Sequence, residues 1–427
     1  MITQEEYGSR RNALLEQLKN DSIAIVLSAL PSSRSNDTEF PYRQNSSFYY
    51  LCGFKEDNAA LLFLKSKKET KTLLFVQKKE PTMELWSGKR MGIDAARSLF
   101  LVDDVYGFDE LESKLAEWVK KKSVAYYDFG MTNPVIARFK ELTKKFYAHH
   151  NIWHLIASMR LVKSHSEITL IRKALEITKE AHHNALRFSK VGKYEYELQA
   201  EFEYIFKKNG AYSDAYTSIV AGGNGANTLH YIANNRRMQA GELLLIDAGC
   251  EYEYYASDIT RTIPVSGRFT PAQRELYEMV LGVELEIIEM IKPGVKRSEL
   301  QKRAEELLTI GMVDLGILQG RVRKLLSTKA HKKYFPHGIG HWMGLDVHDE
   351  APYKEQNGKE IPLAEGMVLT IEPGIYIDEN DQTVPERFRG IGIRIEDDIL
   401  VSAEGHVNLS EGIAKGIEEI ERLSQTY

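Results

Sequence analysis

Acidic residues directly follow apolar, strand-like runs in the second half of the chain. Asp247 follows the run LLLI, and Asp258 lies in the next such segment, SDITRT. An ionised carboxylate at the end of a buried strand is costly unless it is paired with a positive charge or bound to a cation. The alternative is that the Asp247 side chain caps a turn before Ala248 and Gly249. A cation becomes the better explanation once the other acidic residues are counted.

Two more acidic residues follow the same pattern nearer the C-terminus. Glu372 directly follows the apolar run MVLTI, and the segment GIGIRIEDDIL contains Arg394 and Glu396. Isoleucines alternate with these last two residues, so strand geometry places Arg394 and Glu396 on one face. A solvent-exposed edge strand is the alternative explanation for this pair.

Three histidines lie close together in the segment HGIGHWMGLDVHD. His337 and His341 have the i, i+4 spacing of a helical zinc motif, and His348 follows. The neighbouring proline and glycines disfavour a helix, and Gly338 stands where that motif requires glutamate. The helical zinc motif is therefore excluded. A lone histidine is usually a hydrogen-bonded structural residue, but three in a glycine-rich segment favour a site.

The two aspartates, two glutamates and one histidine form an oxygen-rich ligand set. Such a set suits harder divalent ions such as manganese, with cobalt, iron or zinc tolerated. One carboxylate can bridge two ions roughly 3.5 to 4 Å apart, and water held between them becomes a nucleophile near neutral pH. The chemistry that this pattern indicates is hydrolysis.

The elements that must position these residues belong to the second of two domains. Residues 1–158 alternate helical stretches with short apolar strands (SIAIVLSAL, AALLFL, TLLFV and SVAYYDFG), which is typical of an α/β domain without a ligand cluster. We expect the boundary in the segment MRLVKSHS. Residues 159–427 should be α+β, with helices packed on a curved sheet. The amphipathic helices are expected at 167–190, capped by Gly192, and at 195–209, 271–292 and 297–311.

Composition excludes two other classes of partner. The chain has 427 residues and a formal charge of −5, with 56 basic and 61 acidic residues interspersed, so no basic surface is expected to bind nucleic acid. Neither a signal peptide nor an apolar run near the ~18 residues of a membrane helix is present, which predicts a cytoplasmic protein without membrane contact. Cys52 and Cys250 form no disulfide framework and are expected to be packing residues.

The ordered segments DAG, SDITRT, HGIGHWMGLDVHD, TIEPGIYI and GIGIRIEDD together resemble the aminopeptidase P family of pita-bread metallopeptidases. FPYRQNSSFYYLCGF and MELWSGKRMG are similar to that family's N-terminal domain, so the resemblance covers nearly the whole chain. It implies an α/β N-terminal domain followed by an α+β pita-bread catalytic domain. The implied activity is release of the first residue of a peptide by hydrolysis of an Xaa-Pro bond.

The resemblance also implies roles for the residues that match the family's motifs. It implies two divalent ions, with manganese preferred over cobalt, zinc or iron, and these metal ligands: Asp247, Asp258, His341, Glu372 and Glu396. Glu372 would also relay protons to and from the nucleophilic water. His348 would hydrogen-bond the substrate carbonyl, and Arg394 would orient a ligand carboxylate. The free N-terminal amine of the substrate would bind one metal ion.

Further residues are expected to contact the substrate. His230, in NGANTLHY, matches the family's substrate-side histidine, with a plain loop histidine as the alternative, and His337 is a second candidate. The partners implied are peptides with Xaa-Pro N-termini and further copies of the chain, in a homodimer or homotetramer. Trp86 would reach a neighbouring subunit's site, and a packed core tryptophan is the alternative.

Three related functions remain as alternatives. Prolidase, which is specific for Xaa-Pro dipeptides, shares the five ligands, but GMVDLGILQGRVRKLLSTKAHKKYFPHG favours aminopeptidase P. Lys359 lies where relatives often place an arginine, which leaves the peptide-length preference open. A non-catalytic pita-bread protein is disfavoured because all five ligand types are present. Methionine aminopeptidase typically lacks such an N-terminal domain.

Overall fold

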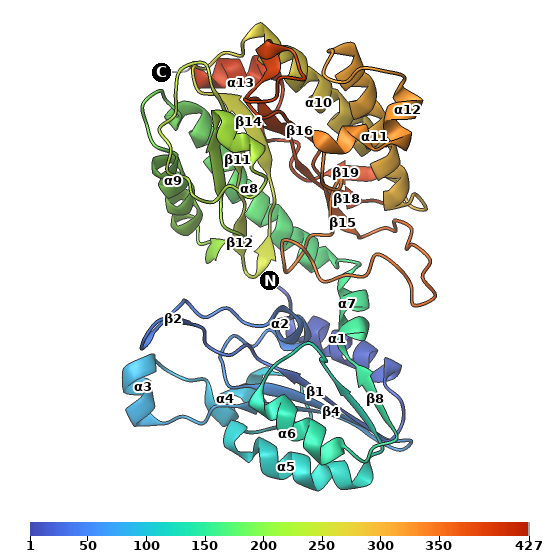
Figure 1. The fold of residues 1–427 in the computed structure, drawn as a ribbon. Coiled ribbons are helices and arrows are strands. Elements are labelled where there is room, and N and C mark those ends of the chain that lie inside the picture. The colour runs from blue at the N-terminus through green and yellow to red at the C-terminus, as the bar shows by residue number, and fades with distance from the viewer. Residues whose placement is uncertain (426–427) are drawn as a thin grey trace. The chain divides into compact units, whose positions relative to one another are not determined.

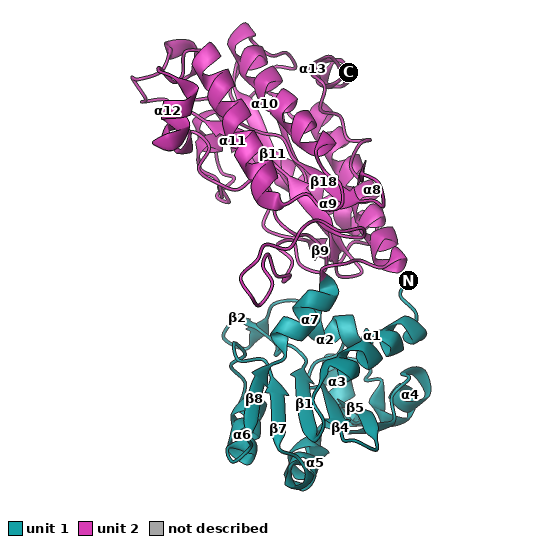
Figure 2. Cartoon of the chain, turned by 90° about the vertical axis from the view of Figure 1, so that its right-hand side faces the viewer, with its two compact units in different colours: residues 1–160 teal, residues 161–427 magenta. Residues whose placement is uncertain are grey.

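The structure is a computed structural model that describes residues 1–425. The chain divides into two compact units, Met1–Arg160 and Leu161–Tyr427 (Figure 2). The division falls inside the segment MRLVKSHS. No helix among the described residues has the length and apolar character needed to cross a membrane.

Unit 1 is an α/β domain built on a six-stranded sheet of order β6-β5-β4-β1-β7-β8. All neighbouring strands run parallel except β4, which is antiparallel to β1 and β5. The strands are β1 (Ser22–Leu27), β4 (Ala60–Lys65), β5 (Thr70–Val76), β6 (Asp104–Gly107), β7 (Val124–Tyr127) and β8 (Ala148–Asn151), with a separate hairpin of β2 (Ser33–Ser35) and β3 (Thr38–Glu39). The four apolar runs seen in the sequence correspond to β1, β4, β5 and β7.

Helices cover this sheet because its central strands are apolar on both faces. Every residue of β1 is buried, and α5 and α6 contribute Leu115 and Phe139 to the core beneath the strands (Figure 1). The helices of unit 1 are α1 (Gln4–Gln17), α2 (Ser46–Cys52), α3 (Pro81–Ser87), α4 (Gly92–Leu99), α5 (Leu111–Trp118), α6 (Pro134–Thr143) and α7 (Trp153–Arg160). Cys52 is buried, as expected of a packing residue.

Unit 2 has its long helices where the amphipathic pattern predicts them. They are α8 (His165–Phe188), α9 (Glu195–Lys208), α10 (Pro271–Glu289) and α11 (Arg297–Asp314). Two shorter helices, α12 (Val322–Ser327) and α13 (Ile417–Ser424), follow them in the chain. The expected cap of α8 was wrong: the helix ends at Phe188 with an extended Ser189. Gly192 lies beyond the end of the helix. Its N–H donates to the Met238 carbonyl and not to a carbonyl of the last helical turn, so it does not cap the helix.

Short antiparallel sheets fill the centre of unit 2 (Figure 1). One contains β10 (Ile219–Gly222), β11 (Leu243–Asp247) and β14 (Thr260–Pro264), and another contains β15 (Val368–Ile371), β18 (Asp397–Val401) and β19 (His406–Asn408). β16 (Gly374–Tyr376) pairs with β17 (Gly392–Arg394), and β12 (Cys250–Tyr252) pairs with β9 (Ser213–Asp214) and β13 (Tyr255–Ala256). The Glu396 N–H donates to the Thr260 carbonyl at 3.1 Å, which joins the first two sheets beside the site.

Gly249 allows the close chain crossing that follows Asp247. A Cβ atom at this residue would lie 1.8 Å from the carbonyl oxygen of Ser257, a backbone atom that cannot move aside. Ser257 directly precedes Asp258, so this crossing sets the spacing between Asp247 at the end of β11 and Asp258 just before β14.

We therefore expect Gly249→Ala to destabilise unit 2 by about 1–3 kcal/mol, because the added methyl group forces the two strands apart. The matched control is Gly282→Ala in α10, where nothing lies within 4 Å of the new Cβ. This exposed helical site should gain about 0.5–1 kcal/mol from the better helix former. Thermal unfolding of both variants checks the pair, and a Gly249→Ala protein as stable as the wild type would contradict the account.

Candidate metal centre and substrate cavity

Unit 2 contains a cavity of about 640 Å³ that collects the predicted site residues. Side chains from segments that lie far apart in the sequence line it. All nine candidates from the catalytic half are among them: His230, Asp247, Asp258, His337, His341, His348, Glu372, Arg394 and Glu396. Trp86 is not, since it lies in unit 1.

Backbone pairing brings these residues together. Asp247 ends β11 and pairs with Thr260 of β14, just beyond Asp258. Glu372 lies between β15 and β16, and Glu396 between β17 and β18. The histidine segment runs beside β15, because the Thr370 N–H donates to the His341 carbonyl at 2.9 Å. The side chains therefore converge from strand ends, not from helices, as the exclusion of the helical zinc motif required.

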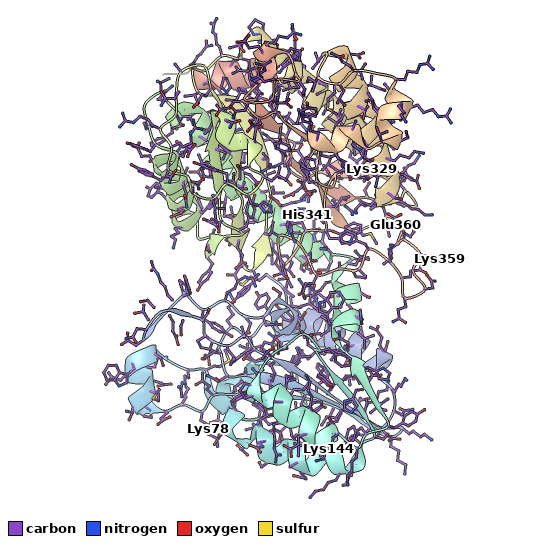
Figure 3. All side chains as sticks on the ribbon, viewed as in Figure 1. Lys78, Lys144, Lys329, His341, Lys359 and Glu360 are labelled. Carbon is purple, nitrogen blue, oxygen red and sulfur yellow. The ribbon has the colours of Figure 1, made fainter. Side chains whose placement is uncertain are left out.

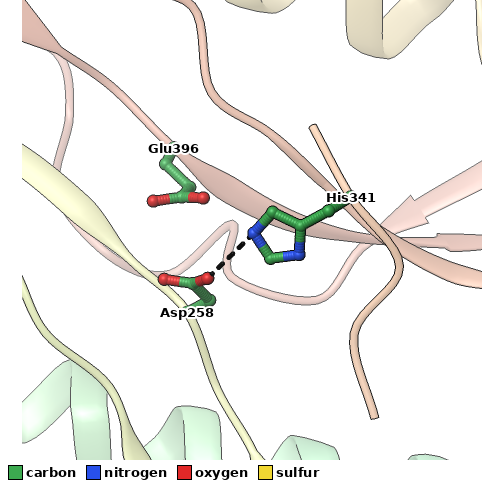
Figure 4. A group of neighbouring side chains, drawn as sticks. All are labelled: Asp258, His341 and Glu396. Atoms are coloured by element: carbon green, nitrogen blue, oxygen red, sulfur yellow. Dashed lines mark ion pairs between the residues drawn. The ribbon is translucent and has the colours of Figure 1, made fainter. Parts of the chain in front are cut away.

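The tightest cluster consists of Asp258, His341 and Glu396 (Figure 4). One ligand atom of each lies within 4.8 Å of the others. The His341 Nε2 atom is 3.3 Å from Asp258 Oδ2 and 3.8 Å from Glu372 Oε1. Its Nδ1 atom is 3.1 Å from the Trp342 carbonyl, so donation there leaves Nε2 to face the carboxylates.

Arg394 fixes the opposite side of the cluster. Its Nη2 donates to Asp247 Oδ2 at 2.6 Å, its Nη1 to the Tyr376 hydroxyl at 3.0 Å and its Nε to Thr260 Oγ1 at 3.1 Å. Thr260 in turn donates to Glu396 Oε2 at 2.6 Å. The contact with Thr260 shared by Arg394 and Glu396 confirms that both side chains lie on one face.

Burial and hydrogen bonding contradict two of the alternative explanations drawn from the sequence. Arg394 is 4% exposed and Glu396 is 2% exposed, so they do not decorate a solvent-exposed edge strand. The Asp247 carboxylate accepts from the Tyr216 hydroxyl and Arg394, so it does not serve as a turn cap.

Burial raises the pKa values of three of the clustered carboxyl groups. Burial is the main cause for Glu372, whose pKa rises to about 7, and for Glu396, whose pKa rises well above its usual value. The pKa of Asp247 is also raised by burial, against the lowering effect of Arg394. Burial alone would lower the pKa of His341, but hydrogen bonding to Asp258 and the charge of Glu372 raise it to about 9.

A metal centre fits this arrangement. Anionic oxygens and one imidazole nitrogen are ligands for hard and intermediate divalent ions. A cation among them would favour the ionised carboxylates that burial otherwise disfavours.

Tyr216 is a site residue that the sequence analysis missed. Its hydroxyl lies 2.6 Å from Asp247 Oδ1 and 2.5 Å from Asp258 Oδ1, so it bridges the two aspartates. Burial, followed by the charges of Asp247 and Asp258, raises its pKa well above the usual value, which keeps the phenol protonated. It lies three residues before the start of β10, in a segment without a motif, so no sequence signal identified it.

Arg261 is a second residue that was missed, although it lies in the motif SDITRT. Its buried guanidinium donates to the Glu396 carbonyl at 2.7 Å and to Asp397 Oδ1 at 2.7 Å. It also donates to the carbonyls of Ile413 and Ala414, each at 3.0 Å. The C-terminal segment is thereby bound to the back of the strand that carries Glu396.

The other histidines surround the cluster. The ring centroids of His348 and His341 are 4.1 Å apart, and burial lowers the pKa of His348, as does the charge of His341. His337 Nε2 is 2.8 Å from the Tyr376 hydroxyl, and its Nδ1 is 3.7 Å from Glu372. His230 is exposed on the cavity wall after the short helix η3 (Gly223–Asn227).

Trp86 lies on the surface and is not the packed core tryptophan that was the alternative explanation. It is 83% exposed on α3, a helix with no buried residue. The packed-core alternative is therefore wrong.

Comparison with known proteins identifies both parts of the chain. Residues 169–403 match metallopeptidase family M24, and residues 7–127 match the aminopeptidase P N-terminal domain. Xaa-Pro aminopeptidase of Escherichia coli is 40% identical over 99% of this chain and 98% of its own. Xaa-Pro aminopeptidase of Haemophilus influenzae is 38% identical over 99% of this chain and 97% of its own.

Solved structures agree over the same length. Proline aminopeptidase P II from Yersinia pestis has a TM-score of 0.96 at 39% identity and covers 100% of both chains. Aminopeptidase P from Escherichia coli with the inhibitor Pro-Leu has a TM-score of 0.95 at 40% identity, over 99% of this chain and 98% of that one. The predicted α/β N-terminal domain and α+β pita-bread catalytic domain are confirmed. The chain belongs to the aminopeptidase P family of metallopeptidases.

Proposed function

We propose that this chain is a metallo-aminopeptidase that releases the first residue from peptides with proline in second position. The observation that carries the proposal is the cluster of three buried carboxylates, the largely buried Glu372 and His341 in one cavity. The full-length similarity to Xaa-Pro aminopeptidases supports it.

Five residues would hold two divalent ions, with manganese preferred because oxygen ligands predominate: Asp247, Asp258, His341, Glu372 and Glu396. When bound, such ions supply the positive charge that makes water a nucleophile near neutral pH. Tyr216 and Arg394 hold the carboxylate of Asp247 in place by hydrogen bonds.

Proton transfer and carbonyl activation would fall to Glu372 and His348. The carboxylate of Glu372 lines the cavity beside His341, where it can take a proton from water and return it. His348, with its lowered pKa, is a neutral imidazole that can donate to the substrate carbonyl as negative charge develops there. His230 and His337 would contact the peptide from the cavity wall.

Residues 1–158 would serve assembly into a homodimer or homotetramer, with residues 159–427 as the catalytic domain. Exposure of Trp86 on α3 supports this proposal, because a large exposed aromatic side chain is typical of an interface. Trp86 would contact the peptide in a neighbouring subunit. A cytoplasmic location remains part of the proposal.

Substrate class and metal dependence can be tested together. The protein treated with a chelator should be inactive, and added manganese or cobalt should restore cleavage of an Xaa-Pro-Yaa tripeptide. Xaa-Ala-Yaa should be cut poorly under the same conditions. Hydrolysis confined to Xaa-Pro dipeptides would instead make the chain a prolidase, and full activity of protein shown to be metal-free by elemental analysis would exclude the metal centre.

The two neighbouring histidines should fail differently when each is changed to alanine. His341→Ala should bind less metal and regain activity in part at high manganese, because the defect lies in occupancy. His348→Ala should keep its metal and lose about 10² to 10³ in kcat, because a donor to developing charge is gone. Bound metal and kcat are measured on both, with exposed His165→Ala as the control. A metal-depleted or nearly fully active His348→Ala protein would refute the assignment.

Arg394 should tune metal affinity without binding the ion. We expect Arg394→Ala to weaken metal binding about 10- to 100-fold, because the Asp247 carboxylate loses the donor that orients it. Titration with manganese measures the change. The control is Arg387→Ala, which removes an exposed guanidinium paired with Glu275; equal metal affinity in the two variants would show that Arg394 has no such role.

A further inference from the structure

Arg297 supplies a fixed positive charge to the wall of the cavity. It is the first residue of α11 and lines the cavity beside Gly338 and Gly340. Its Nη1 donates to the Gly340 carbonyl at 2.5 Å, and its guanidinium carbon lies 4.4 Å from the ring centroid of Tyr353. A hydrogen bond on one side and an aromatic face on the other hold the guanidinium in place.

The support beneath this guanidinium is itself rigid. Tyr353 stacks on Trp342, with ring centroids 5.5 Å apart and 17° between the planes. Trp342 is 1% exposed and belongs to the core of unit 2. The loop that carries Tyr353 is tied to the start of α11, because Glu360 accepts from the backbone N–H and the hydroxyl of Ser298 at 2.8 and 2.5 Å. Figure 3 labels Glu360 and Lys359 on this loop.

No carboxylate among residues 1–425 lies within ion-pair distance of Arg297. Glu360 feels its charge, but hydrogen bonds to Ser298 are the larger cause of the lowered pKa of that carboxyl group. Arg303, on the same helix, instead pairs with Glu286 at 2.6 Å and Glu306 at 2.7 Å. A guanidinium with one carbonyl partner keeps N–H donors for a ligand, and its planar fork suits a carboxylate.

Its place in the cavity determines which part of a peptide it can meet. The carbonyl that it binds belongs to Gly340, directly before His341, whereas Tyr353 at its other side is 38% exposed. Arg297 therefore lies between the buried carboxylates and the solvent. A peptide whose first bond lies at the metal centre has only one residue before that bond, so the remainder of the chain must extend towards solvent along the wall.

We infer that Arg297 is a specificity residue that binds a carboxylate on the residue following proline. This rests on the proposed function and adds a substrate class to it. Two sources share this chemistry: the terminal carboxylate of a tripeptide, and an Asp or Glu side chain in the third residue of a longer peptide.

The test compares substrates that differ only in this carboxylate. Ala-Pro-Ala is compared with Ala-Pro-Ala-amide for the terminal source, and Ala-Pro-Asp-amide with Ala-Pro-Asn-amide for the side-chain source. In the manganese-loaded wild-type protein, kcat/KM should favour the carboxylate member of at least one pair about 10-fold, mainly through KM, as expected for one charge-assisted hydrogen bond. The pair that shows the preference identifies the source.

Arg297→Gln should abolish that preference, because kcat/KM should fall more on the carboxylate peptide than on its uncharged partner. Arg297→Lys, which keeps the charge without the planar fork, should retain part of it. Arg303→Gln, on the same helix, should retain all of it.

Three results would overturn the inference: equal kcat/KM within both wild-type pairs, an unchanged preference in Arg297→Gln, or an equal fall in kcat on every peptide in both Arg297 variants, which would show a structural role. Cleavage of the amide peptides reports separately on the proposed function. If the wild type cuts none of the four peptides, the proposed function fails and the inference fails with it.

Discussion

The crowding of four carboxylates in one cavity, three of them buried and the fourth largely so, is the constraint on which the rest of unit 2 depends. Asp247, Asp258, Glu372 and Glu396 repel one another, and each loses hydration on burial. Arg394 and the phenol of Tyr216 offset part of this cost. The part of this cost that remains favours the binding of a cation, because a cation would supply the positive charge that the ionised carboxylates need. Stability and metal binding are therefore coupled in this fold.

A second layer of charge holds the strand ends that carry the cluster. Arg261 binds the Glu396 carbonyl and the Asp397 side chain, and Lys415 contacts both Asp397 and Glu284 of α10. Arg261 and Lys415 lower the pKa of Asp397 far enough to outweigh the effect of burial. These contacts join β14, the start of β18, α10 and the C-terminal segment behind the site. The geometry of the cluster is thus set by buried ion pairs and backbone hydrogen bonds, not by the loops at the mouth.

The cavity wall is chemically unlike its floor. Acidic groups lie deepest, histidines surround them, and Arg297 with Tyr353 lies nearer to solvent. Under the proposed function, this polarity would favour one direction for a bound peptide, with its amino end towards the carboxylates and its remaining chain beside the guanidinium of Arg297.

The amino-acid sequence by itself determined the α/β and α+β classes and the four long helices, because period-2 and period-3.6 patterns are local. Acidic residues at the ends of apolar strands and three histidines in one glycine-rich segment indicated most of the nine candidate residues of the cavity, and the family resemblance added His230 and the expected roles. Only the tertiary structure decided that Tyr216 bridges two aspartates, that Arg261 binds behind Glu396 and that Arg297 reaches the cavity. The role of such a tyrosine or arginine cannot be recognised in the sequence, because it depends on partners far along the chain. Backbone pairing brings those partners within hydrogen-bond distance only in the folded protein.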